Sequence, residues 1–165
     1  MRTEAHMRDR LDAIDWKILE ELQGDGRMTN VELARRVGIS APPCLRRVRA
    51  LEEAGLIRGY RALLDARRLG MEVSAFAFVQ LSSNAEADLL DFRKRMDATP
   101  TVRECWMLSG DVDFLLKCAA PDLASFQAFV MELTGAPKVK TVKTALTLAQ
   151  TKDAPSVPLP RQAVE

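Results

Sequence analysis

Two adjacent prolines, Pro42 and Pro43, lie in a segment that otherwise has helical spacing, and they constrain where a helix in this part of the chain can begin. Proline lacks an N–H group and breaks the interior of a helix. It is tolerated in the first turn, where N–H groups have no partner within the helix. Ser40, a residue type that commonly caps helices, stands two residues before the pair. The sequence therefore predicts a helix that Ser40 caps and the prolines stiffen at its start.

The predicted helix after Ser40 carries three arginines, and its phase indicates where they point. At 100° per residue, Leu45, Val48 and Leu51 form one stripe, which we expect to face the core. The other side holds the residues expected to point outward: Pro43, Arg46, Arg47 and Ala50, with Arg49 at the margin. The helix is thus expected to present a basic face to the solvent.

Two shorter patterns precede this helix. Apolar residues recur at helical spacing over 11–22, and the glycines of "QGDGR" end that stretch. Thr29 and Glu32 have the spacing of a capping box and predict a second, short helix that stops at Gly38. Two helices joined by a short glycine-containing turn, with a basic outer face on the second, are typical of a helix-turn-helix that places its second helix in the DNA major groove.

The charge distribution agrees with a nucleic-acid contact at this place. The whole chain has a net charge of only +1, but residues 33–61 contain seven arginines and two glutamates. A local basic stripe is the electrostatic footprint of phosphate binding, although a solvated charged face is the simpler alternative. The "LIRGYRALLD" segment, residues 56–65, contains β-branched and aromatic residues and predicts an extended segment after the helix, as in winged arrangements.

The DNA-contacting residues expected from this geometry fall into two groups. Arg46 or Arg47 can contact guanine O6 and N7 in a bidentate way, while arginines on the flanks suit phosphates. The first turn of the helix also meets the groove. The complete expected set is Arg35, Arg36, Ser40, Ala41, Pro42, Pro43, Arg46, Arg47 and Arg49. Plain surface charge is the alternative for the arginines.

From residue 73 onward the pattern changes to strands alternating with helices. Strands are predicted at 73–82, 101–109, 114–120 and 138–150, and helices at 85–96 and 122–133. The order β-α-β-β-α-β predicts a ferredoxin-like antiparallel sheet with both helices on one face, and hence an α+β chain. The expected divisions are a tail at 1–10, a DNA-binding domain at 11–65, a linker at 66–72, the ferredoxin-like domain at 73–150 and a tail at 151–165.

The first strand of this domain has apolar residues on both faces. Residues 73, 75, 77, 79 and 81 form one apolar face, and Phe76 and Phe78 lie on the other. Exposed phenylalanines are an association patch, so we expect two copies to pack through this face as a two-fold dimer. The alternative is that a wing or the C-terminal tail covers it.

Composition excludes several other classes of protein. No apolar run approaches the roughly 18 residues needed to span a bilayer, and the N-terminus lacks a signal-peptide core, so we expect a cytoplasmic chain without a membrane contact. The cysteines Cys44, Cys105 and Cys118 are widely spaced and form no C-x-x-C pair. We expect them to be reduced thiols that are mostly packed in the protein. A zinc site made of these and His6 lacks paired ligand spacing, so neither a metal nor another cofactor is expected.

Taken together, the segments "LDAIDWKILEELQGDGRMTNVELARRVGISAPPCLRRVRALEEAGLIRGYRALLD" and "ECWMLSGDVDFLLKCAAPDL" closely resemble the Lrp/AsnC, or feast/famine, family of transcription regulators. The resemblance covers residues 11 to 150. It implies a DNA-binding domain, regulation of amino-acid metabolism, and dimers that assemble further into octamers or other rings. It also implies a small effector, usually an amino acid, bound between C-terminal domains.

Carried over residue by residue, the family's effector region matches the turn "SGDVD". The implied effector-binding residues are Met107, Leu108, Ser109, Gly110, Asp111 and Asp113. An amino acid offers an ammonium that suits a carboxylate and a carboxylate that suits backbone N–H groups, and a Gly-Asp turn can supply both. The alternative is a simple hairpin turn in which Gly110 permits positive φ.

Two other functions remain open at this point. Sirohaem decarboxylases resemble the same two-domain architecture, so the fold alone does not exclude catalysis. Their chemistry engages a histidine near the tetrapyrrole, whereas the single histidine here is His6, outside both predicted domains. The third possibility is an architectural DNA binder without an effector, which the near-neutral net charge disfavours.

Overall fold

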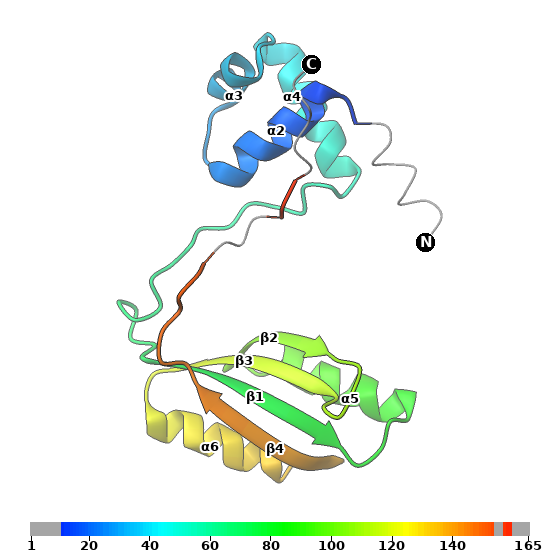
Figure 1. Cartoon of the computed structure of the whole chain (residues 1–165), viewed down its shortest axis with the longest axis vertical. Coiled ribbons are helices and arrows are strands. Elements are labelled where there is room, and N and C mark those ends of the chain that lie inside the picture. The colour runs from blue at the N-terminus through cyan, green and yellow to red at the C-terminus, as the bar shows by residue number, and fades with distance from the viewer. Residues whose placement is uncertain (1–10, 154–156, 160–165) are drawn as a thin grey trace. The chain divides into compact units, whose positions relative to one another are not determined.

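The computed structural model describes residues 11–153 and 157–159 of the chain. It divides into two compact units, which Figure 1 shows. The first unit contains the described residues up to Leu63 together with Asp153 and residues 157–159, and the second runs from Leu64 to Lys152. Labels follow Figure 1, in which the first labelled helix is α2.

The first unit contains a three-helix domain made of α2 (Ala13–Gly24), α3 (Asn30–Val37) and α4 (Ala41–Glu53). Asp12 caps α2 in a capping box with Asp15, and Gly38 ends α3 in the left-handed conformation, with φ of 79°. Apolar side chains of all three helices meet in one core, whose buried members are Ile18, Leu33, Ala34, Val37, Cys44 and Leu51. The predicted helix-turn-helix is confirmed.

The phase of α4 differs from the sequence prediction. Leu45, expected in the core, is 40% exposed, and Cys44 is fully buried in its place. At 100° per residue, positions 45, 48 and 51 spread over about 120° of the helix surface, whereas 44, 48 and 51 lie within about 60°. The narrower stripe packs more completely against α2 and α3, so the small thiol of Cys44 takes the core position and Leu45 faces outward.

Residues 58–65, after α4, form neither helix nor strand in the described structure. The segment predicted to be extended after the helix therefore contains no strand. A strand requires a hydrogen-bonded partner, and this segment pairs with no other described segment of the chain. Its leucines Leu63 and Leu64 are consequently 80% and 72% exposed.

The second unit is a four-stranded antiparallel sheet with two helices. Its elements are β1 (Val73–Leu81), α5 (Glu86–Asp97), β2 (Val102–Met107), β3 (Phe114–Ala120), α6 (Leu123–Thr134) and β4 (Val139–Leu146). The strand order β2-β3-β1-β4, with every neighbouring pair antiparallel, confirms the ferredoxin-like topology. Figure 1 shows β1 and β3 in the centre of the sheet.

The core of this unit lies between the sheet and both helices, which therefore cover the same face. The alternation predicted for the first strand is confirmed, because Ala75, Ala77, Val79 and Leu81 are all buried. The helices contribute Phe92 and Met96 from α5, and Phe126, Phe129 and Leu133 from α6. Leu123, the first residue of α6, is 58% exposed and does not take part in this core.

The opposite face of the sheet carries a row of apolar side chains from three strands. Leu115 of β3 pairs with Phe78 of β1 on one side and with Trp106 of β2 on the other. Trp106 is 41% exposed, and Phe76, Phe78 and Leu115 are partly exposed. The face that the helices leave uncovered is thus apolar at its centre.

The described part of the C-terminal tail contacts α2. The Gln23 side chain donates from Nε2 to the Val157 carbonyl at 2.9 Å and accepts from the Val157 N–H at 2.7 Å. The predicted tail begins at residue 151, and residues 154–156 and 160–165 lie outside the described residues, as does the predicted N-terminal tail at 1–10. Val157 thus belongs to the three-helix unit.

The structure also shows the state of the cysteine side chains. All three cysteines are free thiols, and burial raises the pKa of Cys118 to about 11. Among the described residues no group of three His, Cys, Asp or Glu side chains is placed to hold a metal ion, and His6 lies outside that part of the chain. The helices that the structure describes include none with the length and apolarity to cross a membrane.

Candidate DNA-binding surface and effector turn

The start of α4 is arranged differently from an ordinary capped helix. Ser40 occupies the cap position, as predicted, but its side chain makes no capping hydrogen bond. A cap oxygen normally accepts from the N–H of the second or third helical residue, and here those residues are Pro42 and Pro43, which have none. The prolines therefore leave the Ser40 hydroxyl available for another partner.

The first turn of α4 is also tied to α3. The Asn30 side chain donates from Nδ2 to the Ala41 carbonyl at 2.8 Å, so the beginnings of the two helices are joined. Ala41 and Pro43 are partly buried, and Pro42 is exposed. The turn between α3 and α4 is consequently held in place before any DNA arrives.

The outward face of α4 holds a shallow depression of about 310 Å³. Its lining residues recur at helical spacing along the whole helix: Pro42, Leu45, Arg46, Arg49, Ala50 and Glu53. Arg49, predicted at the margin, thus lies on the same face as Arg46. Neither arginine has an ion-pair partner in the part of the chain that the structure describes.

Arg47, predicted to point outward with Arg46, lies instead against the N-terminus of α2. Its Nη1 atom is 2.8 Å from both Asp12 Oδ2 and Asp15 Oδ1, and 32% of its side chain is exposed. The backbone N–H of Asp15 and the Arg47 guanidinium hold the pKa of Asp12 below its ordinary value. Arg47 thus joins α4 to α2.

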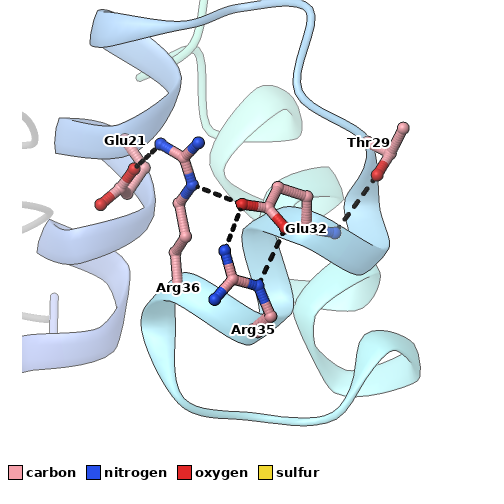
Figure 2. Close-up of polar contacts among 5 residues, drawn as sticks. All are labelled: Glu21, Thr29, Glu32, Arg35 and Arg36. Atoms are coloured by element: carbon pink, nitrogen blue, oxygen red, sulfur yellow. Dashed lines mark hydrogen bonds and ion pairs between the residues drawn. The ribbon is translucent and has the colours of Figure 1, made fainter.

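The two arginines of α3 are held by an acidic residue of their own helix, as Figure 2 shows. Arg35 reaches Glu32 with two hydrogen bonds, of 2.6 and 2.9 Å. Arg36 donates to Glu32 at 2.8 Å and to Glu21 of α2 at 2.9 Å. Hydrogen bonds from Arg35 and then from Arg36 lower the pKa of Glu32 to about 2.

This network also changes the predicted capping box. Thr29 accepts the Glu32 N–H at 3.2 Å, as a capping box requires. The Glu32 carboxylate, however, binds the two arginines rather than the backbone of Thr29. Charged donors form stronger hydrogen bonds to a carboxylate than a backbone N–H does. The Glu32 carboxylate therefore binds the two arginines.

The predicted effector residues lie at the end of β2, which holds Met107, and in the turn between β2 and β3. The Leu108 N–H donates to the Asp113 carbonyl at 2.8 Å, which closes the turn, and Gly110 has φ of 131°, a backbone conformation that favours glycine. Ser109, Gly110 and Asp111 are exposed. Met107 and Leu108 beside them are 68% and 42% exposed.

Asp113 differs from the rest of this turn because it is bound to β1. Its Oδ2 atom accepts the Leu81 N–H at 2.7 Å, and its own N–H donates to the Val79 carbonyl at 3.0 Å. The Leu81 contact lies where the pairing between β1 and β4 shifts register. Asp113 therefore supports the end of β1, and its second carboxylate oxygen is the one that remains for a ligand.

Sequence reasoning did not identify Asp12, Asp15 or Glu21 as partners of the predicted DNA-binding arginines. Arg47 is 35 residues from Asp12 in the chain, and Arg36 is 15 residues from Glu21. A helical wheel describes one helix at a time, so it carried no signal for these contacts. The Glu32 pairs, by contrast, have the spacing of three and four residues that the sequence displays.

The structure thus combines a helix-turn-helix unit that presents a basic helix with a separate ferredoxin-like unit, an arrangement typical of a two-domain transcriptional regulator. A family model for winged helix-turn-helix DNA-binding domains matches residues 11–58. A second model, for the Lrp/AsnC ligand-binding domain, matches residues 74–157. The chain belongs to the Lrp/AsnC family of transcriptional regulators.

Individual relatives agree over almost the whole chain. The leucine-responsive regulatory protein of Rhizobium meliloti is 62% identical over 149 residues, which cover 90% of this chain and 96% of that protein. The Escherichia coli protein of the same name is 40% identical over 143 residues, with 86% and 87% coverage. These relatives share both domains with the chain.

The solved structures give the same result. A transcriptional regulator from Neisseria meningitidis, determined as a complex with L-Met, is 38% identical with a TM-score of 0.85, over 90% of this chain and 96% of that one. An AsnC-family regulator from Agrobacterium tumefaciens is 34% identical with a TM-score of 0.83, over 90% and 97%. The predicted family and fold class are confirmed.

Proposed function

We propose that this regulator binds specific DNA sequences through the outward face of α4. The observation that carries the proposal is the division among its arginines. Arg46 and Arg49 have no ion-pair partner among the described residues and lie on one exposed face, whereas Arg35, Arg36 and Arg47 are bound to carboxylates. An unpaired guanidinium binds a base edge or a phosphate without first breaking an ion pair.

The residues of this surface then have distinct roles. Arg46 contacts guanine O6 and N7, and Arg49 contacts a phosphate. The Ser40 hydroxyl, which the prolines leave without a capping partner, donates to a phosphate near the start of α4. Ala41, Pro42 and Pro43 lie close to the base edges in that first turn.

The paired arginines contribute in another way. Arg35 is 72% exposed, so it binds a phosphate in exchange for one of its hydrogen bonds to Glu32. Arg36 makes a weaker phosphate contact in the same way. Arg47 positions α4 through its contacts with α2 and stays a candidate for guanine only if those contacts open.

The effector is a free amino acid bound at the turn from Met107 to Asp113. The exposed Asp111 carboxylate binds the ammonium group, and N–H groups of the turn at Ser109 and Gly110 bind the carboxylate. Met107 and Leu108 provide apolar contacts for a side chain. The L-Met complex of the Neisseria meningitidis relative supports this choice of ligand class.

The chain functions as a dimer that assembles further, with an octamer as the expected form. The apolar row of Phe78, Leu115 and Trp106 on the uncovered sheet face supports the pairing of two copies. A two-fold dimer presents two α4 helices to a pseudo-palindromic site. The effector, bound between subunits, changes the spacing of these helices, and a coupling of about 1 to 3 kcal/mol corresponds to a roughly 5- to 150-fold change in DNA affinity.

We further propose that the chain acts in the cytoplasm, where the chromosome lies, and is not an enzyme. The relatives are named as regulators, which supports this. The chain has one histidine, His6, so it offers no Ser-His or Cys-His pair within the two domains. A purified protein with tetrapyrrole absorbance would instead favour the decarboxylase alternative.

The test is fluorescence anisotropy on the DNA upstream of the protein's own gene and on a scrambled duplex. It is run at low and near-physiological salt, with and without a pool of amino acids. We expect a preference for the upstream DNA that survives the higher salt and changes with the pool. A preference lost at high salt would indicate a phosphate-driven architectural binder.

Two variants separate the components of the proposal. Arg46→Ala is expected to lower the preference for the upstream sequence, and Asp111→Ala to abolish the response to amino acids while leaving DNA binding unchanged. Glu20→Ala, at an exposed position of α2 that belongs neither to the outward face of α4 nor to the effector turn, is the control and is expected to behave as the wild type. Light scattering of the same samples measures the oligomer, and a monomer at all concentrations would contradict the dimer.

A further inference from the structure

The placement of Leu45 suggests a role that electrostatics does not cover. The Leu45 side chain is 40% exposed, while the preceding residue, Cys44, is fully buried in the core. Single exposed leucines are common on protein surfaces, so exposure alone identifies nothing. Leu45, however, lies in the shallow depression of the outward face of α4, with Pro42 one turn before it and Arg49 one turn after it.

Leu45 shares this face with two arginines, Arg46 and Arg49, whose ligands are polar or charged. Arg46 and Arg49 bind base edges or phosphates, whereas a leucine side chain can gain free energy only by contact with an apolar group. The major groove offers one such group on its base edges, the C5 methyl of thymine. We infer that Leu45 is a specificity-determining residue that contacts the methyl group of a thymine in the DNA site.

The position of that thymine relative to the arginine contacts follows from helix geometry. Leu45 and Arg46 are consecutive residues of α4, about 1.5 Å apart along the helix axis and about 100° apart around it, so their side chains reach the same or neighbouring base pairs. The thymine is therefore expected at, or next to, the base pair that Arg46 contacts. This inference rests on the proposed function, because it assumes that α4 lies in the major groove.

The effect of one methyl group is small but measurable. Burial of a single methyl group against Leu45 corresponds to about a fourfold change in the dissociation constant. Replacement of thymine by deoxyuridine removes the C5 methyl and leaves base pairing and charge unchanged, so it isolates this contact. The full chain is first used to select duplexes from a random-sequence pool, which makes the test independent of any assumed target gene.

In the selected duplex, each thymine is replaced in turn by deoxyuridine, and anisotropy is measured at constant salt. For the wild type we expect one thymine in each half-site at which the replacement weakens binding about fourfold. Leu45→Ala is expected to weaken binding to the thymine duplex by a similar factor and to lose all sensitivity at that position. Leu45→Met, which keeps an apolar side chain, retains the sensitivity.

Two controls separate this contact from general effects. Val31→Ala removes another exposed apolar side chain, 71% exposed, from α3 and is expected to keep the fourfold sensitivity. Thermal unfolding shows whether Leu45→Ala still folds, which its exposure leads us to expect. If that variant is unfolded, Leu45→Gln, which keeps the length of the side chain but ends it in a polar amide, replaces it and is expected to lose the sensitivity.

The outcomes are distinct. A wild-type scan without a sensitive thymine, or an equal sensitivity in Leu45→Ala, overturns the inference while leaving the proposed function intact. A pool from which the wild type selects no sequence overturns the proposed function and this inference with it. A thymine sensitive in the wild type, in Leu45→Met and in Val31→Ala, but not in Leu45→Ala, establishes the contact.

Discussion

The guanidinium of Arg47 lies 2.8 Å from the carboxylate of Asp15, Nη1 to Oδ1, and so links the DNA-binding helix α4 to the first turn of α2. Asp15 is mostly buried, with 15% of its side chain exposed, while the second partner, Asp12, is 51% exposed. Asp12 also caps α2, so one cation supports both a helix start and a helix–helix contact. Arg46, the residue before Arg47, has no ion-pair partner among the described residues.

Arg47→Ala is expected to lower the free energy of unfolding of the DNA-binding domain by about 1 kcal/mol, because it breaks two partly exposed ion pairs. Arg46→Ala is the matched variant and is expected to weaken DNA binding without a change in stability. Urea unfolding and anisotropy of both proteins measure the two effects. A stable Arg47→Ala protein with fully lost DNA binding would place Arg47 on the base edges instead.

Glu32 is expected to titrate near pH 2 rather than near its ordinary 4.5, because Arg35 and Arg36 stabilise its charged form. Because its pKa is lower in the folded state, Glu32 stabilises the folded protein fully at pH values above 4.5. This contribution is lost as the pH falls from 4.5 through about 2. NMR titration of the Glu32 side-chain carboxyl carbon measures the midpoint. The double variant Arg35→Ala, Arg36→Ala should return it toward 4.5.

The control for this titration is Arg46→Ala, which removes an arginine that does not contact Glu32. Its midpoint is expected to equal that of the wild type. A midpoint near 4.5 in the wild-type protein would show that the network in Figure 2 does not persist in solution.

Asp113→Ala is expected to destabilise the ferredoxin-like domain by about 1 to 2 kcal/mol, because the partly buried Leu81 N–H loses its acceptor. Asp113→Asn keeps an acceptor oxygen and should be affected less. Thermal unfolding measures stability, and anisotropy with the amino-acid pool measures the effector response. If Asp113→Ala keeps the full effector response, Asp113 does not belong to the effector site.

Gln23→Ala is expected to release the described part of the C-terminal tail, since Gln23 makes both hydrogen bonds to Val157. Each such bond contributes about 1 kcal/mol, so the loss of both should make the Val157 amide hydrogen exchange with solvent roughly 30-fold faster. Hydrogen exchange followed by NMR measures this rate. Glu20→Ala, an exposed position on the same helix, is the control and should leave the rate unchanged.

Much of the fold was predictable because its signals are local. The alternation from Val73 to Leu81 predicted which side chains are buried in β1, and the prolines predicted the start of α4. That the same prolines deprive the Ser40 hydroxyl of its capping partner was not predicted, although it follows from their positions two and three residues after Ser40. The missing strand at 58–65 has a related cause, because extended propensity does not supply a hydrogen-bonded partner.

The sequence by itself determined the order of the elements, the helix-turn-helix, the βαββαβ topology and the family, since these depend on residue spacing along the chain. The tertiary structure decided which arginines are available to DNA and which residue of α4 enters the core. Arg47 meets Asp12 and Asp15, and Asp113 meets Leu81, only after distant segments pack together. Leu45 faces outward because Cys44, Val48 and Leu51 form the narrower stripe against α2 and α3, and that choice depends on three helices at once.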